Sequence, residues 1–95
     1  MEKEILILNS RLATYNFEDG RNATYNRVTF SFRDDLADKE MIGFNNVLSC
    51  SLNPNSFEIT KNIRPNQLVK CTLGLKRAEN NTFKYTITKI NNVEV

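Results

Sequence analysis

The residues with the clearest binding chemistry are arginines and aromatic residues that recur along residues 11–33. Side chains two positions apart in a strand point to the same face, so Tyr25 and Arg27 share a face. Aromatic rings stack on nucleobases, at about 1 to 3 kcal/mol per base, and guanidinium groups bind phosphates; neither interaction reads sequence. The predicted face carries Arg11, Tyr15, Phe17, Tyr25, Arg27 and Arg33.

The same side chains allow a second interpretation. Tyr15 and Phe17 could form an additional apolar layer beneath a loop or a partner subunit, with the arginines paired to nearby carboxylates. Both interpretations require a hairpin of residues 5–17 and 23–33 around a Gly-containing turn. We assume a register with Tyr15 opposite Tyr25, which gives a dry face on which Leu12 faces Val28 and Leu8 faces Phe32.

A second long hairpin is predicted by two alternating runs, residues 68–77 and 82–90. A three-residue loop with Asn81 in the left-handed conformation keeps the apolar side chains on one face. The expected apolar pairs are Leu75 with Tyr85 and Leu73 with Ile87. The alternation breaks at residues 88–89, which predicts a bulge there.

The opposite face of this hairpin carries a row of lysines. Lys76 and Lys84 become cross-strand neighbours, a like-charge pair that an anion would relieve, and Lys70 lies in the same row. Residues 61–95 hold seven basic and two acidic residues, whereas residues 1–60 hold six basic and nine acidic ones. This asymmetry indicates a basic surface. In the alternative interpretation the lysines only solubilise the hairpin and protect its edges.

Together these elements predict an all-β fold. Residues 43–52 form a third strand, residues 56–63 a short helical turn, and the final hairpin supplies strands four and five. The count and order fit one domain, residues 1–95, built as a small five-stranded OB-type barrel with a helical plug between strands 3 and 4. The alternatives are an SH3-like barrel and a sandwich that is completed by dimerisation.

Composition limits the chemistry. The 95 residues include no histidine, only three glycines and two well-separated cysteines, Cys50 and Cys71, which we expect to be reduced core residues rather than a disulfide. The acidic residues 34–42 lack the spacing of a calcium loop and are expected to be a solvated loop. We therefore predict no enzyme, metal or cofactor. Without a signal peptide or spanning segment, a cytoplasmic location off the membrane is expected.

The order of parts resembles a known family. A first hairpin bearing Arg11, Tyr15, Arg21, Tyr25 and Arg27, a middle strand, and the final hairpin of residues 67–95 look like the small single-stranded-DNA-binding proteins of phages and plasmids. These include the filamentous-phage protein that coats replicating DNA as an OB-fold homodimer. The resemblance implies a sequence-tolerant groove on the first hairpin, with Arg21 at its tip and Tyr25 as a stacking ring. The acidic residues 34–40 and the modest net charge of +2 depart from it.

Two functions follow as hypotheses. The first is a dimeric single-stranded DNA- or RNA-binding protein of a mobile element, with a role in DNA replication. The second is a small all-β protein-interaction module, an inhibitor or assembly factor, because Tyr and Arg are enriched in protein interfaces as well. The expected nucleic-acid-binding residues are Arg11, Tyr15, Phe17, Arg21, Tyr25, Arg27, Arg33, Lys70, Lys76 and Lys84.

Overall fold

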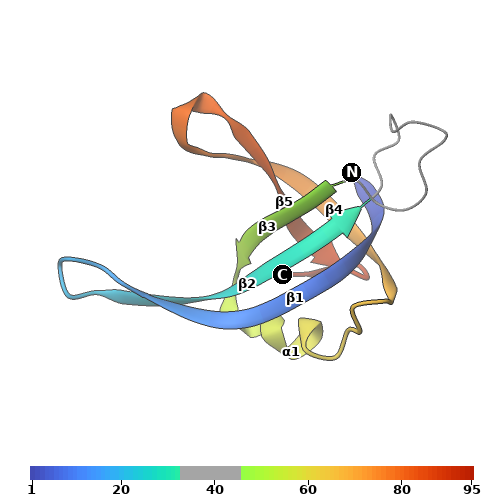
Figure 1. Cartoon of the computed structure of the whole chain (residues 1–95), viewed down its shortest axis with the longest axis horizontal. Coiled ribbons are helices and arrows are strands. Elements are labelled where there is room, and N and C mark those ends of the chain that lie inside the picture. Colours follow the sequence, from blue (N-terminus) through green and yellow to red (C-terminus); the bar gives the residue numbers. More distant parts are fainter. Residues whose placement is uncertain (33–45) are drawn as a thin grey trace.

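A computed structural model describes residues 1–32 and 46–95 of the chain. The described residues form one antiparallel sheet in the order β3-β2-β1-β4-β5-β6, so the predicted all-β class is confirmed. Its strands are β1 (Glu2–Asn16), β2 (Asn22–Phe32), β3 (Asn46–Leu52), β4 (Leu68–Arg77), β5 (Phe83–Ile90) and β6 (Val93–Glu94). The β1–β2 and β4–β5 hairpins project from the body as two separate ribbons (Figure 1).

A bulge in β1 determines which side chains reach the core. Ile7 pairs with Phe30 and Asn9 pairs with Thr29, which leaves Leu8 without a partner on β2. An extra residue reverses the alternation of a strand. Ile5 and Ile7 therefore point inward before the bulge, although without it they would share a face with Arg11. The bulge explains the consecutive apolar residues at the start of the chain.

The β4–β5 hairpin has the predicted register. Leu75 pairs with Tyr85, Leu73 with Ile87, and Lys76 with Lys84. Asn80 and Asn81 in the loop both have positive φ angles, 59° and 58°, which asparagine tolerates better than most residues. The predicted bulge is also confirmed, since Thr72 pairs with Lys89 while Leu73 pairs with Ile87. Because Thr88 has no partner on β4, the alternation reverses there and the Ile90 side chain points into the core.

The β1–β2 hairpin differs from the assumed register by two residues. Tyr15 pairs with Ala23 and Tyr25 pairs with Ala13, so the two tyrosines are diagonal neighbours rather than directly opposed. The predicted pairing of Leu12 with Val28 and of Leu8 with Phe32 is wrong: Leu12 pairs with Asn26 and Leu8 lies at the bulge, and both are exposed. The cause is the position of the loop, which comprises residues 17–21 rather than the assumed 18–22. Moving the centre of the loop by one residue shifts every pair by two. A shift of two residues leaves every side chain on the same face of the sheet as before.

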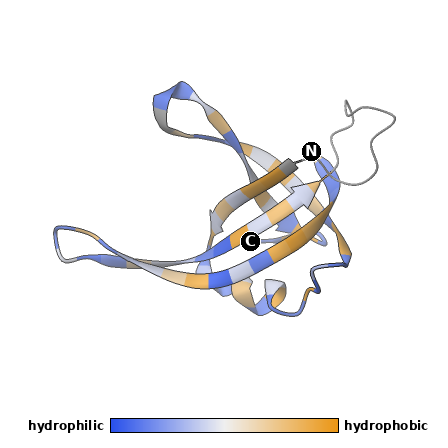
Figure 2. Ribbon diagram, in the orientation of Figure 1, coloured by the Kyte–Doolittle hydropathy of each residue, from blue (hydrophilic) through white to orange (hydrophobic). Residues whose placement is uncertain are grey.

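The core lies between the two halves of the curved sheet. It contains Ile5, Ile7, Val28, Phe30, Phe32, Cys50, Leu52, Val69, Cys71, Leu73, Ile87 and Ile90. Hydrophobic colour marks the first part of β1 and much of β3, while the loops of both hairpins are mainly hydrophilic (Figure 2). Both cysteines are buried and free, as expected.

A short helical segment lies between β3 and β4, as predicted. It comprises a 3-10 turn, η1 (Pro54–Ser56), and one turn of α-helix, α1 (Phe57–Thr60). Its Ser56 and Thr60 are buried against the inward amide of Asn26, which donates to Ser56 Oγ at 2.9 Å and to Thr60 Oγ1 at 3.0 Å. Hydrogen bonds between buried polar groups thus attach the plug to β2.

The sheet is not closed into a barrel. β3 is one end of the sheet, and among the described residues no backbone hydrogen bond joins it to β5. A sixth strand, β6, follows a tight turn at Asn91 and Asn92, whose positive φ angles match a two-residue hairpin turn. Among the residues that the structure describes, β6 pairs only with the end of β5, through Lys89 and Ile90. The five-stranded count therefore missed one short strand.

Three parts of the sequence prediction lie outside the described residues: Arg33, the acidic residues 34–42, and residues 43–45 at the start of the predicted third strand. No helix in residues 1–32 and 46–95 is long and apolar enough to cross a bilayer.

Candidate nucleic-acid interface

The outer face of the β1–β2 ribbon carries two exposed tyrosines next to two arginines. The rings of Tyr15 and Tyr25 lie 5.9 Å apart, tilted by 53°, and their exposed fractions are 42% and 37%. Arg11 pairs directly with Arg27 one step further toward the body. Alternation places all four side chains on one face. Like charges in direct cross-strand pairs are unfavourable without a bound anion, so this face suits an anionic ligand.

The tip of the ribbon is arranged differently. Arg21 lies over the ring of Phe17, with its Cζ 5.6 Å from the ring centroid, and its Nε donates to Asp19 Oδ2 at 2.5 Å. The Asp19 carboxylate also accepts the backbone N–H of Arg21. Phe17 and Arg21 therefore partner each other, and Arg21 is already neutralised by Asp19. For Phe17 to stack on a base and Arg21 to bind a phosphate, the Arg21–Asp19 ion pair must open. The free-energy cost of opening it is small, because the pair is exposed to solvent.

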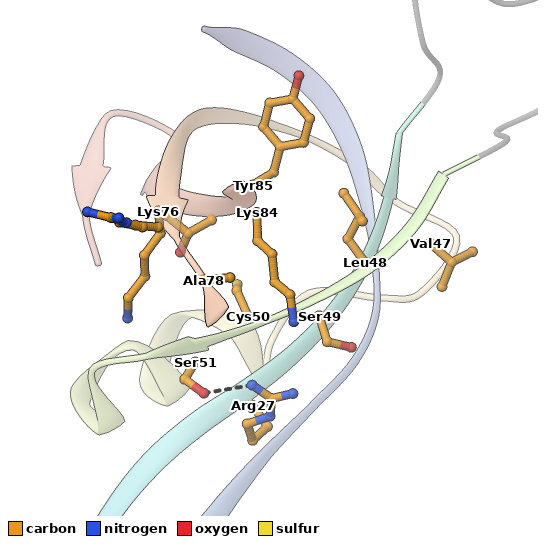
Figure 3. Close-up of a pocket in the computed structure, with 12 residues that line it drawn as sticks. Arg27, Val47, Leu48, Ser49, Cys50, Ser51, Lys76, Ala78, Lys84 and Tyr85 are labelled. Atoms are coloured by element: carbon orange, nitrogen blue, oxygen red, sulfur yellow. Dashed lines mark hydrogen bonds between the residues drawn. The ribbon is translucent and has the colours of Figure 1, made fainter. Parts of the chain in front are cut away.

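A cleft of about 420 Å³ separates β3 from the β4–β5 hairpin. Its β3 wall is formed by residues 47–51 and its hairpin wall by residues 76–78 and 84–86, with Arg27 from β2 below. The Arg27 guanidinium donates to Ser51 Oγ at 2.7 Å, which fixes it beside β3. Figure 3 shows the Lys76 and Lys84 side chains extending from the hairpin, and Arg27 bonded to Ser51.

The cleft brings two predicted surfaces together. Arg27 belongs to the arginine and aromatic face of the first hairpin, and Lys76 and Lys84 belong to the lysine row of the second. Together with Arg77 they place four cations around one opening. None of the described residues that line it is an Asp or Glu. Positive charge gathered in a groove concentrates anions and accelerates their association.

Lys70 does not share this cleft. It pairs with Glu4 across the β1–β4 ladder, and its Nζ lies 4.0 Å from a carboxylate oxygen of Glu2. The predicted lysines therefore share one face of the sheet, but Lys70 lies apart from Lys76 and Lys84 because the sheet curves between Lys70 and Lys76.

Comparison of the chain with protein-family models, curated proteins and solved structures finds no match.

Arg77 lines the cleft but was not among the binding residues predicted from the sequence. Strict alternation places this residue with Leu73 and Leu75 on the apolar face, so it was not counted as basic surface. At the end of the ribbon that face is open to solvent, and Arg77 lines the cleft and donates to the Asn81 side chain. The adjacent basic pair Lys76 and Arg77, just before a loop, is the sequence signal that could have identified it.

Cys50 lies at the floor of the cleft and is unsuited to reactive chemistry. Burial raises the pKa of its thiol, although the Ile87 backbone, Thr86 and Arg27 act in the opposite direction. A thiol that holds its proton is a weak nucleophile. The cleft therefore offers binding groups rather than an activated nucleophile.

Proposed function

We propose that the protein binds single-stranded nucleic acid without sequence preference and without catalysis. The observation that carries the proposal is the position of Arg27, which lies where the tyrosine face of the β1–β2 ribbon meets the cleft bearing Lys76 and Lys84. A strand bound along this path stacks bases on Tyr15 and Tyr25 and places phosphates near the cations. Sequence tolerance follows, because stacking and phosphate contacts read no base edges.

An OB-type architecture is part of the proposal. Strands β1 to β5 lie in the order β3-β2-β1-β4-β5, with a helical segment between β3 and β4. OB folds are partly open five-stranded barrels that bind oligonucleotides on strands 2 and 3 and on the loops between strands 1 and 2 and strands 4 and 5. The ribbon, the outer face of β2 and β3, and the β4–β5 hairpin are the corresponding surfaces here. This correspondence supports the resemblance to the DNA-coating proteins of phages and plasmids, and with it a role in replication of a mobile element.

We also propose that the protein is a homodimer. Leu75 and Phe83 lie on the inward face of the β4–β5 hairpin but beyond the core, and they are 66% and 65% exposed. Exposed large apolar side chains that share one face mark a contact surface. A second copy of the chain can cover this strip while leaving the tyrosine face open.

The same strip supports the alternative function, a protein-interaction module. Salt dependence separates the two. Four phosphate contacts, at Arg27, Lys76, Arg77 and Lys84, give a slope of log affinity against log salt of about −3 for a single strand. A protein interface with an apolar centre responds only weakly to salt.

The test is fluorescence anisotropy with labelled oligo-dT of about 30 nucleotides, longer than the roughly 4 to 16 that one OB domain covers. Titrations at low and moderate salt use the matching duplex as the control. The proposal predicts salt-sensitive binding that favours the single strand. Absence of binding at low salt, or a preference for duplex, rejects it and leaves the interaction module.

A further inference from the structure

We propose that the cleft between β3 and the β4–β5 hairpin also binds an extended acidic peptide, which adds to the free edge of β3 as a further strand. The proposal concerns the backbone groups of the cleft, which the binding of nucleic acid does not use. Three observations carry it: two facing strand edges, an unprotected composition of β3, and the charge of the cleft.

Both walls of the cleft end in strand edges. Among the described residues, β3 pairs with β2 alone. The outer edge of β5 is covered at its end, where β6 pairs with Lys89 and Ile90 and the Val95 N–H donates to the Thr88 carbonyl, so the free stretch of this edge lies within residues 83–87. In the described part of the chain no backbone–backbone hydrogen bond crosses between these edges. They meet at one end of the cleft, where the Cys50 thiol is hydrogen-bonded to the Ile87 backbone, and the open stretch of β3 is residues 47–49. Alternate residues of an edge strand direct N–H and C=O groups away from their partner. A peptide backbone repeats the same donors and acceptors and can satisfy them, as in strand addition to a sheet edge. A sugar-phosphate backbone has no such repeat.

The composition of β3 leaves its edge open. Natural edge strands are commonly protected by charged residues, by proline or by a bulge. β3 reads Asn-Val-Leu-Ser-Cys-Ser-Leu, with no charge and no proline, and its register with β2 is regular throughout. Such an edge is a template for another strand.

The side chains around the edge define the peptide. Arg27, Lys76 and Lys84 belong to the outer face of the sheet, whereas Leu48 and Tyr85 belong to the inner face. Tyr85 also packs edge-on against Phe32, with ring centroids 5.6 Å apart, so the inner side of the seam is apolar. Because residues of a strand alternate between faces, the complementary peptide alternates acidic and apolar residues. Its carboxylates meet the cations while its apolar side chains cover Leu48 and Tyr85.

Such a peptide would occupy the cations assigned above to phosphates. Peptide and oligonucleotide would then compete. This competition rests on the proposed function, whereas peptide binding itself does not. An acidic partner segment could in this way displace the protein from a single strand.

The probe is a fluorescein-labelled peptide of alternating Asp and Val, long enough to span the seven residues of β3. One control peptide replaces alternate valines by proline, which removes backbone donors at constant charge. We expect the proline peptide to bind at least about tenfold more weakly, since several hydrogen bonds are lost. Amide hydrogen exchange should slow in residues 47–49 when the Asp-Val peptide is added.

A matched pair of charge reversals tests the location. Lys84→Glu should weaken peptide binding at least about tenfold, because it replaces an attraction by a repulsion in a confined site. Lys61→Glu makes the same change in net charge at the end of α1, outside the cleft, and should alter binding by less than about twofold.

Three results would overturn the proposal: no peptide binding at low salt, equal binding of the proline peptide, or equal effects of the two reversals. Oligo-dT titrations of the same proteins keep the proposals separate. Oligo-dT binding without peptide binding rejects the strand addition alone, whereas peptide binding without oligo-dT binding supports it and rejects the proposed function.

Discussion

The side-chain amide of Asn26 donates a 3.0 Å hydrogen bond to Thr60 Oγ1, and the two residues are 0% and 2% exposed. Ser10 gives its hydroxyl hydrogen to Asn26 Oδ1 at 2.9 Å, so in the 2.5 Å contact between Ser10 and Thr60 the donor is Thr60. Ser56 accepts the other amide hydrogen of Asn26. This closed network joins β1, β2 and the plug at the base of the ribbon that carries Tyr25 and Arg27.

Asn26→Ala should therefore destabilise the protein by about 2 to 4 kcal/mol, since it leaves a cavity and removes one hydrogen-bond partner from each of Ser10, Ser56 and Thr60. Urea unfolding followed by circular dichroism measures the effect. Asn22→Ala, an exposed substitution on the same strand, should change the free energy of unfolding by less than about 0.5 kcal/mol. Equal midpoints for the two variants would show that the network contributes little.

Tyr25→Ala should weaken oligo-dT binding by about 1 to 3 kcal/mol without changing the salt slope, because stacking involves no counterion release. The control is Thr24→Ala, which removes the exposed contact between Thr14 Oγ1 and Thr24 Oγ1 on the opposite face of the ribbon. Anisotropy titrations should show control binding close to the wild type. A similar loss in both variants would point to damage of the ribbon instead of a stacking site.

Lys84→Ala and Arg27→Ala should each reduce the magnitude of the salt slope by about 0.7, the value for one phosphate contact on a single strand. Arg27→Ala also removes the hydrogen bond to Ser51, so Ser51→Ala is its companion control. That control should keep the wild-type slope. If neither substitution moves the slope in titrations over a range of salt, the cleft does not hold phosphates.

Phe83→Asp should convert the proposed dimer into a monomer, because a carboxylate in an apolar contact is poorly solvated there. Light scattering after size-exclusion chromatography gives the mass directly. Val93→Asp introduces the same charge at another exposed apolar position, on β6, and should leave the dimer intact. A wild-type protein that is already monomeric at high concentration would reject the dimer.

Alkaline conditions should destabilise the fold through its buried thiols. Burial raises the pKa of Cys71 from 9.0 to about 12, with a smaller contribution from Cys50. Above pH 9 the unfolded chain thus binds fewer protons than the folded one, and the free energy of unfolding falls with pH, by up to about 1.4 kcal/mol per pH unit for this thiol. Below pH 9 the contribution of the Cys71 thiol to the free energy of unfolding does not change with pH.

Urea midpoints between pH 7 and pH 10 for the wild type and Cys71→Ala provide the measurement. The variant should be less stable at neutral pH, since it opens a small cavity, but should lose less stability above pH 9. Parallel curves would mean that the Cys71 thiol does not contribute to the pH dependence.

The β4–β5 hairpin was predictable from sequence because its determinants are local. Period-two alternation fixed the pairing of Leu75 with Tyr85, Asn81 supplied the left-handed turn residue, and the break after Ile87 located the bulge. Arg11, Tyr15, Tyr25 and Arg27 share the outer face of the first hairpin as predicted, in spite of a wrong register, since a shift of two residues exchanges no side chain between faces.

Local pattern could not determine the other features, because they depend on how distant segments meet. The bulge at Leu8 and the curvature of the sheet decide that Arg27 shares a cleft with Lys76 and Lys84 while Lys70 lies apart. Asn26 in an otherwise apolar inward row was visible in the sequence, but its partners, 16 to 34 positions away, were not. The sequence by itself determined the strands and their faces through alternation and turn chemistry. The tertiary structure decided the open seam, the cleft and the buried network, because these arise from long-range packing of the sheet on itself.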